Sequence, residues 1–388
     1  MGIPISYNVR NVIQRPLTTL ATGWGIAMVV MILVGAFALA SGFQAALIES
    51  GSPSNAIVMR VGADSEISSG IDRDAAAILK ALPDVAKAPD GRPLVSSDMV
   101  VLTNLPRIGQ SGTSNVTIRG IDPASVLRSD QVKIVDGRMF APGTSEVIVG
   151  QRMSRRFAGL KIGDRVTLGQ QAFNVVGLFT AGGSAFESEV WGDGAVLMPA
   201  LNRESFQSVT FRMKDPSRFL ALKKRLESDP RLGVQVKTER GFYSDQSSLL
   251  AGVLRGAGLM ITLIMAVGAI FGAMNTMYAA VGSRSREIAV LMTLGFSGWA
   301  IMISFLFESM VLALIGGVMG CLLALPINGI TTSTTNWSSF SEVAFAFRVT
   351  PFGILLGLIF AAVLGLVGGF LPARQASTQS LAGSMRAG

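Results

Sequence analysis

The chain has 388 residues, of which 49% are hydrophobic and 15% are charged, and its formal net charge is +8. Soluble domains carry about 25% charged residues, so these values, with a mean hydropathy of +0.50, exclude an ordinary soluble globular protein. The sequence contains no histidine and a single cysteine, Cys321, which excludes histidine-dependent nucleophiles and metal sites, an intrachain disulfide and cysteine zinc clusters.

Charge is concentrated in one block of the sequence. Of the 33 basic and 25 acidic residues, only 11 lie outside residues 44–250, and that remainder contains four long uncharged runs. The runs lie between Arg15 and Glu49, Arg255 and Arg284, Glu308 and Glu342, and Arg348 and Arg374. Because a helix needs about 20 apolar residues to cross a bilayer, we predict four spans at about 17–43, 251–282, 298–326 and 350–372.

The short segments that flank these spans carry more arginine than acidic residues. They contain Arg10 and Arg15 before the first span, Arg284 and Arg286 against Glu287 after the second, and Arg374 and Arg386 after the fourth. Positively charged flanks stay on the cytoplasmic side, so both termini and the turn after the second span are predicted to be cytoplasmic. Residues 44–250 and 327–349 are then extracytoplasmic, and the net positive charge requires no nucleic acid partner.

The amino-terminal region leaves two alternatives open. Residues 1–16 place their aliphatic side chains on one helical face, at Ile5, Val9, Val12 and Ile13. This pattern favours an interfacial helix on the cytoplasmic leaflet over a disordered tail. The first span could also be a signal peptide cleaved near Ala38-Leu39-Ala40, but its apolar stretch is about twice the 7–15 residues of a signal h-region. We therefore predict an uncleaved anchor.

Residues 50–245 alternate strand and helix signals. Strands are indicated at about 56–61, 147–149, 172–179, 209–213 and 234–237, and helices at 72–82 and 215–226. A block of about 200 residues can bury a core of its own. The sequence therefore predicts a large α+β extracytoplasmic domain inserted between the first and second spans. Boundaries near Gly120 and Met198 would make residues 120–198 an inserted module.

The first two spans are expected to continue beyond the membrane, because their helical apolar spacing extends to Ile48 and begins again near Leu249. A continuous helix from Leu249 to Gly282 would be about 50 Å long, whereas the hydrocarbon core is about 30 Å thick. Residues 17–49 and 246–282 are therefore each predicted to combine a span with a stalk that carries the outer domain.

The turn after the second span, residues 283–297, has a pattern that a simple connection does not require. Ser285 can cap a short helix and Gly295 can end it. Ile288, Leu291 and Met292 share one face of this helix. An exposed apolar helix face usually docks onto a partner, so we expect the segment to contact another protein.

This segment resembles a known family. The run R-S-R-E-I-A-V-L-M-T-L-G-F-S at 284–297 resembles the R-x-R-E-I-G-x-L-x-A-L-G-A signature of MacB/FtsX/LolC-type ABC transporter permeases. The run L-P-A-R-Q-A-S at 371–377 is similar to the family's P-A-R-x-A exit, and the runs at 137–140 and 162–164 resemble its outer domain. One departure is Met292-Thr293, where the family often has Arg-Ala.

The resemblance implies a four-span permease of a type VII ABC transporter in the bacterial inner membrane. Such subunits dimerise, bind a cytoplasmic ATPase dimer through a coupling helix at 283–297, and transmit its movement through the stalks for export. The implied ATPase-coupling residues are Arg284, Arg286, Glu287, Ile288, Leu291, Met292 and Gly295. Because the sequence has no G-x-x-x-x-G-K-[ST] loop, we expect no catalytic residue, metal or cofactor in this chain, and ATP and magnesium in a separate ATPase subunit.

Three classes of function remain open from the sequence. They are an export permease, which can work with a periplasmic adaptor protein; FtsX-like signalling without transport, or lipoprotein release; and a membrane-anchored enzyme or sensor without an ATPase. The coupling signature argues against the last class. The size and two-module form of the outer block favour export over signalling, since FtsX-like outer domains are usually smaller.

Other polar and small residues are candidates for a role in coupling or packing. An ionised carboxylate within a span is costly, so Glu308 is expected to reach the interface or to contact Arg284 or Arg286. The glycine pairs Gly268/Gly272 and Gly316/Gly320 fit close helix packing and a membrane dimer. Glu187 and Glu189 could form an acid–base pair, although carboxylates in a glycine-rich loop are more often solvated.

Overall fold

A computed structural model describes residues 16–109, 111–122 and 132–378, which form two compact units. The membrane unit comprises the described residues of 1–41, 252–330 and 347–388, and the outer unit comprises those of 42–251 and 331–346. Two helices, α2 (Pro16–Ile48) and α7 (Glu239–Ser283), contribute residues to both units without a break. The interfacial helix expected at 1–16 and the end of the tail, 379–388, lie outside the described residues apart from Pro16, the first residue of α2.

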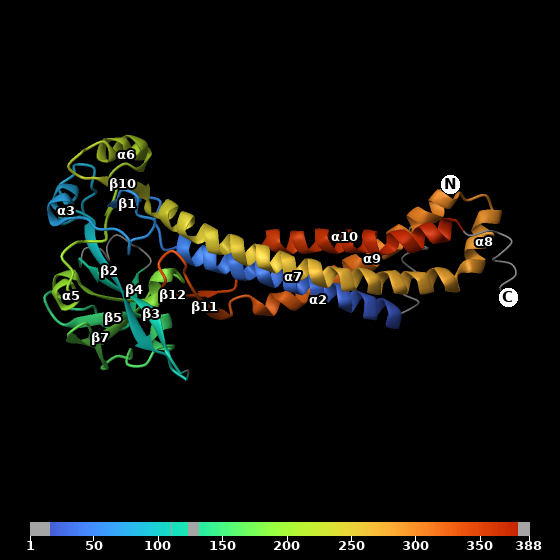
Figure 1. Cartoon of the computed structure of the whole chain (residues 1–388), viewed down its shortest axis with the longest axis horizontal. Helices are drawn as coiled ribbons and strands as arrows, with labels where there is room; N and C mark the ends of the chain where they lie inside the picture. Colours follow the sequence, from blue (N-terminus) through green and yellow to red (C-terminus); the bar gives the residue numbers. More distant parts are fainter. Residues whose placement is uncertain (1–15, 110, 123–131, 379–388) are drawn as a thin grey trace. The chain divides into compact units, whose positions relative to one another are not determined.

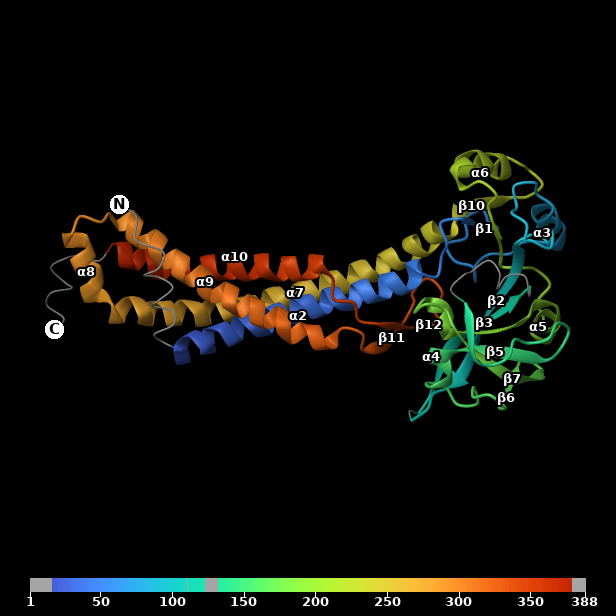
Figure 2. The ribbon, with the colours of Figure 1, turned by 180° about the vertical axis from the view of Figure 1, so that it is seen from behind.

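The membrane unit consists of four long helices that lie side by side (Figures 1 and 2). Besides α2 and α7, the long helices are α9 (Gly298–Ala324) and α10 (Pro351–Ser377). The short helix α8 (Ser285–Thr293) lies between α7 and α9 in the sequence, and η4 (Leu325–Ile327) follows α9. All four are long and apolar enough to cross a membrane. This confirms the predicted order of the chain, in which one span precedes the outer domain and three spans follow it.

Glycines set the closest helix contacts in this unit. A Cβ at Gly316 would lie 2.6 Å from the carbonyl oxygen of Gly23, and one at Gly320 would lie 2.5 Å from that of Ala27. Helices α2 and α9 therefore approach too closely for a larger residue at either glycine. On α7, a Cβ at Gly268 or Gly272 would meet no atom of the described chain within 4 Å, so this pair leaves an open helix face.

We expect Gly320→Val to destabilise the membrane unit, because overpacking a close contact typically costs about 1–3 kcal/mol. Gly25→Val, the same change at a position of α2 where a Cβ would meet no atom of the described chain within 4 Å, is the matched control and should leave the stability unchanged. Thermal unfolding of the two purified variants in one detergent measures the difference. Equal midpoints would contradict the close approach of α2 and α9.

In the described part of the outer unit, ten strands form one sheet, ordered β10-β1-β9-β2-β3-β8-β5-β7-β4 with β6 beside β7. Its strands are β1 (Asn55–Arg60), β2 (Val95–Pro106), β3 (Thr113–Ile121), β4 (Lys133–Gly137), β5 (Glu146–Gly150), β6 (Arg165–Leu168), β7 (Gln171–Thr180), β8 (Glu189–Asp193), β9 (Ser208–Arg212) and β10 (Val234–Thr238). The pairs β3–β8 and β5–β7 are parallel, and the other pairs are antiparallel. A mixed sheet with separate helices confirms the predicted α+β class.

Two apolar cores divide the outer unit into two modules, and Figure 2 labels several elements of each. The first core draws on residues 56–95 and 209–236, and the second on residues 99–200. The accompanying helices are α3 (Arg73–Lys80), η3 (Pro216–Arg218) and α6 (Phe219–Glu227) in the first module, and α4 (Gln151–Ser154), η2 (Ala185–Ser188) and α5 (Gly194–Ala200) in the second.

The boundary between the modules differs from the one expected near Gly120, which lies inside β3. The change of core occurs within β2, whose first residues pair with β9 and whose remaining residues pair with β3. Met198 likewise lies inside α5 rather than in a linker. Because one continuous strand serves both modules, the sequence contains no linker there to mark the change.

A β-hairpin occupies the segment between α9 and α10, where the sequence pattern predicts only a loop at 327–349. It consists of β11 (Thr331–Thr335) and β12 (Glu342–Ala346) and belongs to the outer unit. The rings of Phe345 and Phe43 are both buried and meet edge to face at 5.6 Å. The N–H of Ala344 donates to Ser188 Oγ at 2.9 Å. The outer domain is thus completed by residues 331–346, which follow the rest of the unit (42–251) only after two membrane helices.

Candidate functional site

The segment expected to contact a partner forms α8, at one end of the helix bundle (Figures 1 and 2). Ile288 is only 2% exposed and packs in a core with Met277 of α7 and Ile301 of α9, and Met292 packs against the same core. Of the three residues expected to form the docking face, Ile288 and Met292 therefore face the bundle, and Leu291 is half-buried. Their role in coupling to an ATPase stays a prediction. Burial of each apolar side chain contributes about 1.5–3 kcal/mol, which favours packing this face against the bundle.

The outward face of α8 carries a different set of residues. Val290 is 57% exposed and Leu294 is 71% exposed, and Arg286 and Glu287 are also exposed. These four residues are called the α8 strip. Gly295 follows with a positive φ of 91°, a conformation that glycine adopts without strain and that ends the helix. Sequence periodicity shows that α8 has apolar residues on more than one face, but only tertiary packing decides which face is buried.

Arg284, the residue before α8, forms an ion pair with Glu308 of α9. Arg284 Nη1 lies 2.8 Å from Glu308 Oε2, and both residues are buried. A charge within a span is tolerated when it is paired, and this contact accounts for the carboxylate in α9. The pair also fixes the start of α8 to a membrane helix.

The single variants Glu308→Leu and Arg284→Met are each expected to lower the free energy of unfolding by about 3–5 kcal/mol, because each leaves one charge buried without its partner. The double variant Arg284→Met/Glu308→Leu should recover most of that loss, since it removes both charges. Denaturant unfolding of the single and double variants in one detergent forms the cycle. Strictly additive losses would argue against coupling between the two side chains.

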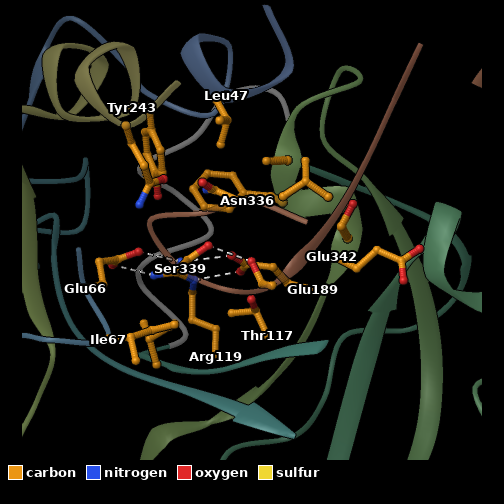
Figure 3. A pocket seen from close by; sticks show the side chains of 17 residues that line it. Leu47, Glu66, Ile67, Thr117, Arg119, Glu189, Tyr243, Asn336, Ser339 and Glu342 are labelled. Carbon is orange, nitrogen blue, oxygen red and sulfur yellow. Dashed lines mark hydrogen bonds and ion pairs between the residues drawn. The ribbon is translucent and has the colours of Figure 1, made fainter. Parts of the chain in front are cut away.

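The outer unit contains a buried charge cluster around Arg119 of β3 (Figure 3). Arg119 donates to Glu66 through Nη1 and Nη2 (2.8 and 2.9 Å) and to Glu189 through Nε and Nη2 (2.7 and 3.0 Å). Asp98 lies 3.3 Å from Nη1. The three carboxylates come from the loop after β1, from β8 and from β2, so the cluster ties distant segments of the outer unit together.

This cluster has the properties of an internal structural network. Burial raises the pKa of Glu189, and Arg119 opposes that rise. Burial would lower the pKa of Arg119, but the charges of Glu189 and Glu66 raise it well above its ordinary value. The adjoining cavity has a volume of only about 40 Å³, which admits water but no larger ligand. No local sequence signal links these residues, because 53 and 70 positions separate Arg119 from the two glutamates.

Glu187 and Glu189 do not share one site, as an acid–base pair would require. Glu187 accepts hydrogen bonds from the hydroxyl of Thr180 and two backbone N–H groups, and it lies 3.0 Å from Arg152. Burial would raise the pKa of Glu187, but these interactions lower it below its ordinary value. Each glutamate is thus committed to its own arginine.

Glu342 anchors the hairpin of β11 and β12 to the second module. Its buried carboxylate lies 2.7 Å from Arg156 Nη2 and also pairs with Arg107. Burial would raise the pKa of Glu342, but hydrogen bonds from two serines and Arg107 and the charge of Arg156 lower it below its ordinary value of 4.5. The ionised form therefore stabilises the docked hairpin.

The hairpin is expected to loosen in acid, because a carboxylate with a lowered pKa contributes stability above about pH 4.5 and loses it as the pH falls through the lowered value. Glu342→Gln should loosen the hairpin at pH 7 by about 1.5–3 kcal/mol and remove this pH dependence. Hydrogen–deuterium exchange of residues 331–346, corrected for its intrinsic pH dependence, measures both effects. Unchanged protection in Glu342→Gln would show that the carboxylate does not hold the hairpin.

Two family models match the chain. The MacB-like periplasmic core domain matches residues 17–229, and the FtsX-like permease C-terminal region matches residues 259–381. The first match covers α2 and most of the outer domain. The second covers the α8 strip, the Arg284–Glu308 pair, α9 and all of α10.

Several curated proteins are similar to the chain. It is 26% identical to the macrolide export ATP-binding/permease protein MacB of Bordetella avium over 268 residues, which are 66% of this chain and 38% of that protein. It is 27% identical to the pyoverdine export ATP-binding/permease protein PvdT of Pseudomonas entomophila over 265 residues, 63% of this chain and 39% of that protein. It is 24% identical to the uncharacterized ABC transporter permease YknZ of Bacillus subtilis over 281 residues, 68% of each. The chain thus spans about two fifths of the length of the MacB relatives that it matches first.

Two solved structures of outer domains are also similar. The extracellular domain of YknZ from Gram-positive bacteria is 15% identical with a TM-score of 0.36, covering 47% of this chain and 99% of that domain. The periplasmic region of MacB from Actinobacillus actinomycetemcomitans is 14% identical with a TM-score of 0.39, covering 50% of this chain and 92% of that region.

Proposed function

Because this chain belongs to the family of MacB-like and FtsX-like ABC transporter permeases, we propose that it couples ATP hydrolysis by a partner ATPase to movement of its extracytoplasmic domain, and that this movement drives export. The names of two relatives, a macrolide exporter and a pyoverdine exporter, support export as the outcome. The chain spans only part of those proteins, so the activity of a whole exporter and its substrate belong to the proposal.

The observation that carries this proposal is the α8 strip. Val290 and Leu294 expose apolar surface beside two charged residues, as protein-docking surfaces do. The opposite face of α8 packs on α7 and α9, and Arg284 ties its start to Glu308. A force on the strip would therefore reach the membrane helices. Helices α2 and α7 continue into the outer unit without a break, which gives that force a covalent route.

The proposed partners follow from the same surfaces. The ATPase would be a separate dimeric subunit that holds ATP and magnesium and binds the α8 strip from the cytoplasm. A second permease, identical or homologous, would cover the open face of α7 at Gly268 and Gly272, where small residues permit close contact. In this proposal the protein lies in the bacterial inner membrane with both termini in the cytoplasm, as the arginine-rich flanks indicate.

Leu294→Asp should release a co-expressed ATPase subunit, because a leucine buried at a contact contributes about 1.5–3 kcal/mol and a carboxylate there must also be desolvated. Recovery of the ATPase with the affinity-purified permease measures the contact. Leu220→Asp is the matched control, since Leu220 on α6 is 77% exposed in the outer unit and should not affect recovery. Full recovery with Leu294→Asp would assign the docking surface elsewhere.

The sequence leaves signalling without transport as an alternative to export, and a transport assay distinguishes these two functions. Both functions require the ATPase to bind the α8 strip, so binding alone does not distinguish them. Sealed vesicles that contain the intact complex should accumulate or lose a candidate substrate on addition of ATP if the function is export. ATP hydrolysis that changes the outer domain but moves no compound in a broad substrate screen would favour signalling.

A further inference from the structure

A cleft follows the boundary between the two modules of the outer unit, apart from both the α8 strip and the cluster around Arg119. It is lined by residues of α3, of α5 and of the segments next to them, and its volume is about 910 Å³. Small-molecule sites typically have volumes of about 300–1,000 Å³. Phe206, one of the lining residues, packs against both apolar cores. The cleft is therefore built where the two cores meet.

Two of the three carboxylates in the cleft are already committed. Asp122 pairs with Lys80, whose Nζ lies 3.6 Å from its Oδ2. Asp193 accepts the backbone N–H groups of Ala195 and Gly143 at 2.9 and 2.6 Å. These contacts leave neither carboxylate as the principal partner for a cationic ligand.

Two guanidinium groups in the cleft are still available. The exposed side chain of Arg203 makes no hydrogen bond or ion pair with the residues that the structure describes. Arg73 uses its Nε to reach the carbonyl oxygen of Glu204 at 3.3 Å, which leaves its two terminal nitrogens. The three cationic and three acidic side chains that line the cleft balance in formal charge, so it is the unused donors of Arg203 and Arg73 that favour an anion. Guanidinium groups suit carboxylate, sulfonate or phosphate oxygens.

A buried hydroxyl and an apolar wall complete the cleft. Ser97 of β2 is 4% exposed, and within the described chain its Oγ has no hydrogen-bond partner. A buried polar group without a partner costs free energy, and a ligand oxygen at this position would remove that cost. Ile121, Met198 and Phe206 also line the cleft, and the half-buried Phe206 presents apolar surface to it.

We propose that this cleft binds an organic anion with an apolar body. Arg203 and Arg73 bind its charged oxygens, Ser97 donates to a further oxygen, and the apolar wall packs against its body. The binding requires neither ATP nor an ATPase, so it does not depend on the proposed export function and can be measured without it.

The test uses the full chain in lipid nanodiscs with naphthalene-1-sulfonate as the probe and 1-naphthylmethylammonium as its cationic counterpart. Ala195→Cys places a reactive thiol on the exposed side of the cleft lining, while the native Cys321 is buried. At ten times its Kd, the sulfonate is expected to slow alkylation of the new thiol by N-ethylmaleimide about tenfold. The cationic counterpart should not slow it.

Two further variants identify the groups that bind the anion. In the Ala195→Cys background, Arg203→Glu should weaken protection at least about tenfold, since a charge-assisted hydrogen bond is lost and a like charge is added. Ser97→Ala should weaken it to a smaller degree. Lys224→Glu, the same charge reversal on exposed α6, is the matched control and should leave protection intact.

Three results would overturn the proposal. Equal protection by both naphthalene compounds would show that apolar contact alone is responsible. Stronger protection by the cation would show that Glu204 and the other carboxylates govern the cleft. Absence of protection by either compound, with the labelled variant folded as judged by its thermal unfolding, would show that the cleft binds no ligand of this class.

Discussion

A charge within a span must be paired, and this constraint determines where charged residues lie along the chain. It confines most charged residues to the outer unit and leaves Glu308 as a carboxylate inside α9, where Arg284 pairs with it. Arg284 immediately precedes α8, so the contact that makes the carboxylate tolerable also sets where α8 begins. The inner face of α8 then packs on α7 and α9. The ion pair that neutralises the intramembrane charge and the apolar packing of the inner face together set the orientation of the α8 strip.

The outer unit uses buried charge for another purpose. Arg119 and its carboxylates join the loop after β1 to β2, β3 and β8, and Glu342 joins the hairpin to Arg107 and Arg156. The chain passes between the two units four times, through α2, through α7 and at both ends of the hairpin segment. Movement of any of the four membrane helices thus has a covalent connection to a domain that is internally cross-linked by ion pairs.

Much of the fold could be predicted because its signals are local. Uncharged runs identified all four long helices, and the apolar strands β1, β5, β7, β9 and β10 were indicated by their own residues. The hairpin was not, since β11 is the polar run Thr-Thr-Ser-Thr-Thr and forms only by pairing. The same limit applied to the site: periodicity found α8, but burial of Ile288 depends on helices distant in sequence. The Arg119 cluster could not be predicted either, because 53 and 70 positions separate Arg119 from its two glutamates in the sequence.

Coupling from α8 to the outer domain is tested most directly by a distance measured during the ATPase cycle. Gln170, exposed in the turn between β6 and β7, offers a site for a spin label in each copy of the permease in the complete complex, reconstituted in nanodiscs. Double electron–electron resonance measures the distance between the two labels, and hence between the outer domains, with and without trapped ATP. Coupling predicts a different distance distribution in the two states. An unchanged distribution in a complex that hydrolyses ATP would contradict it.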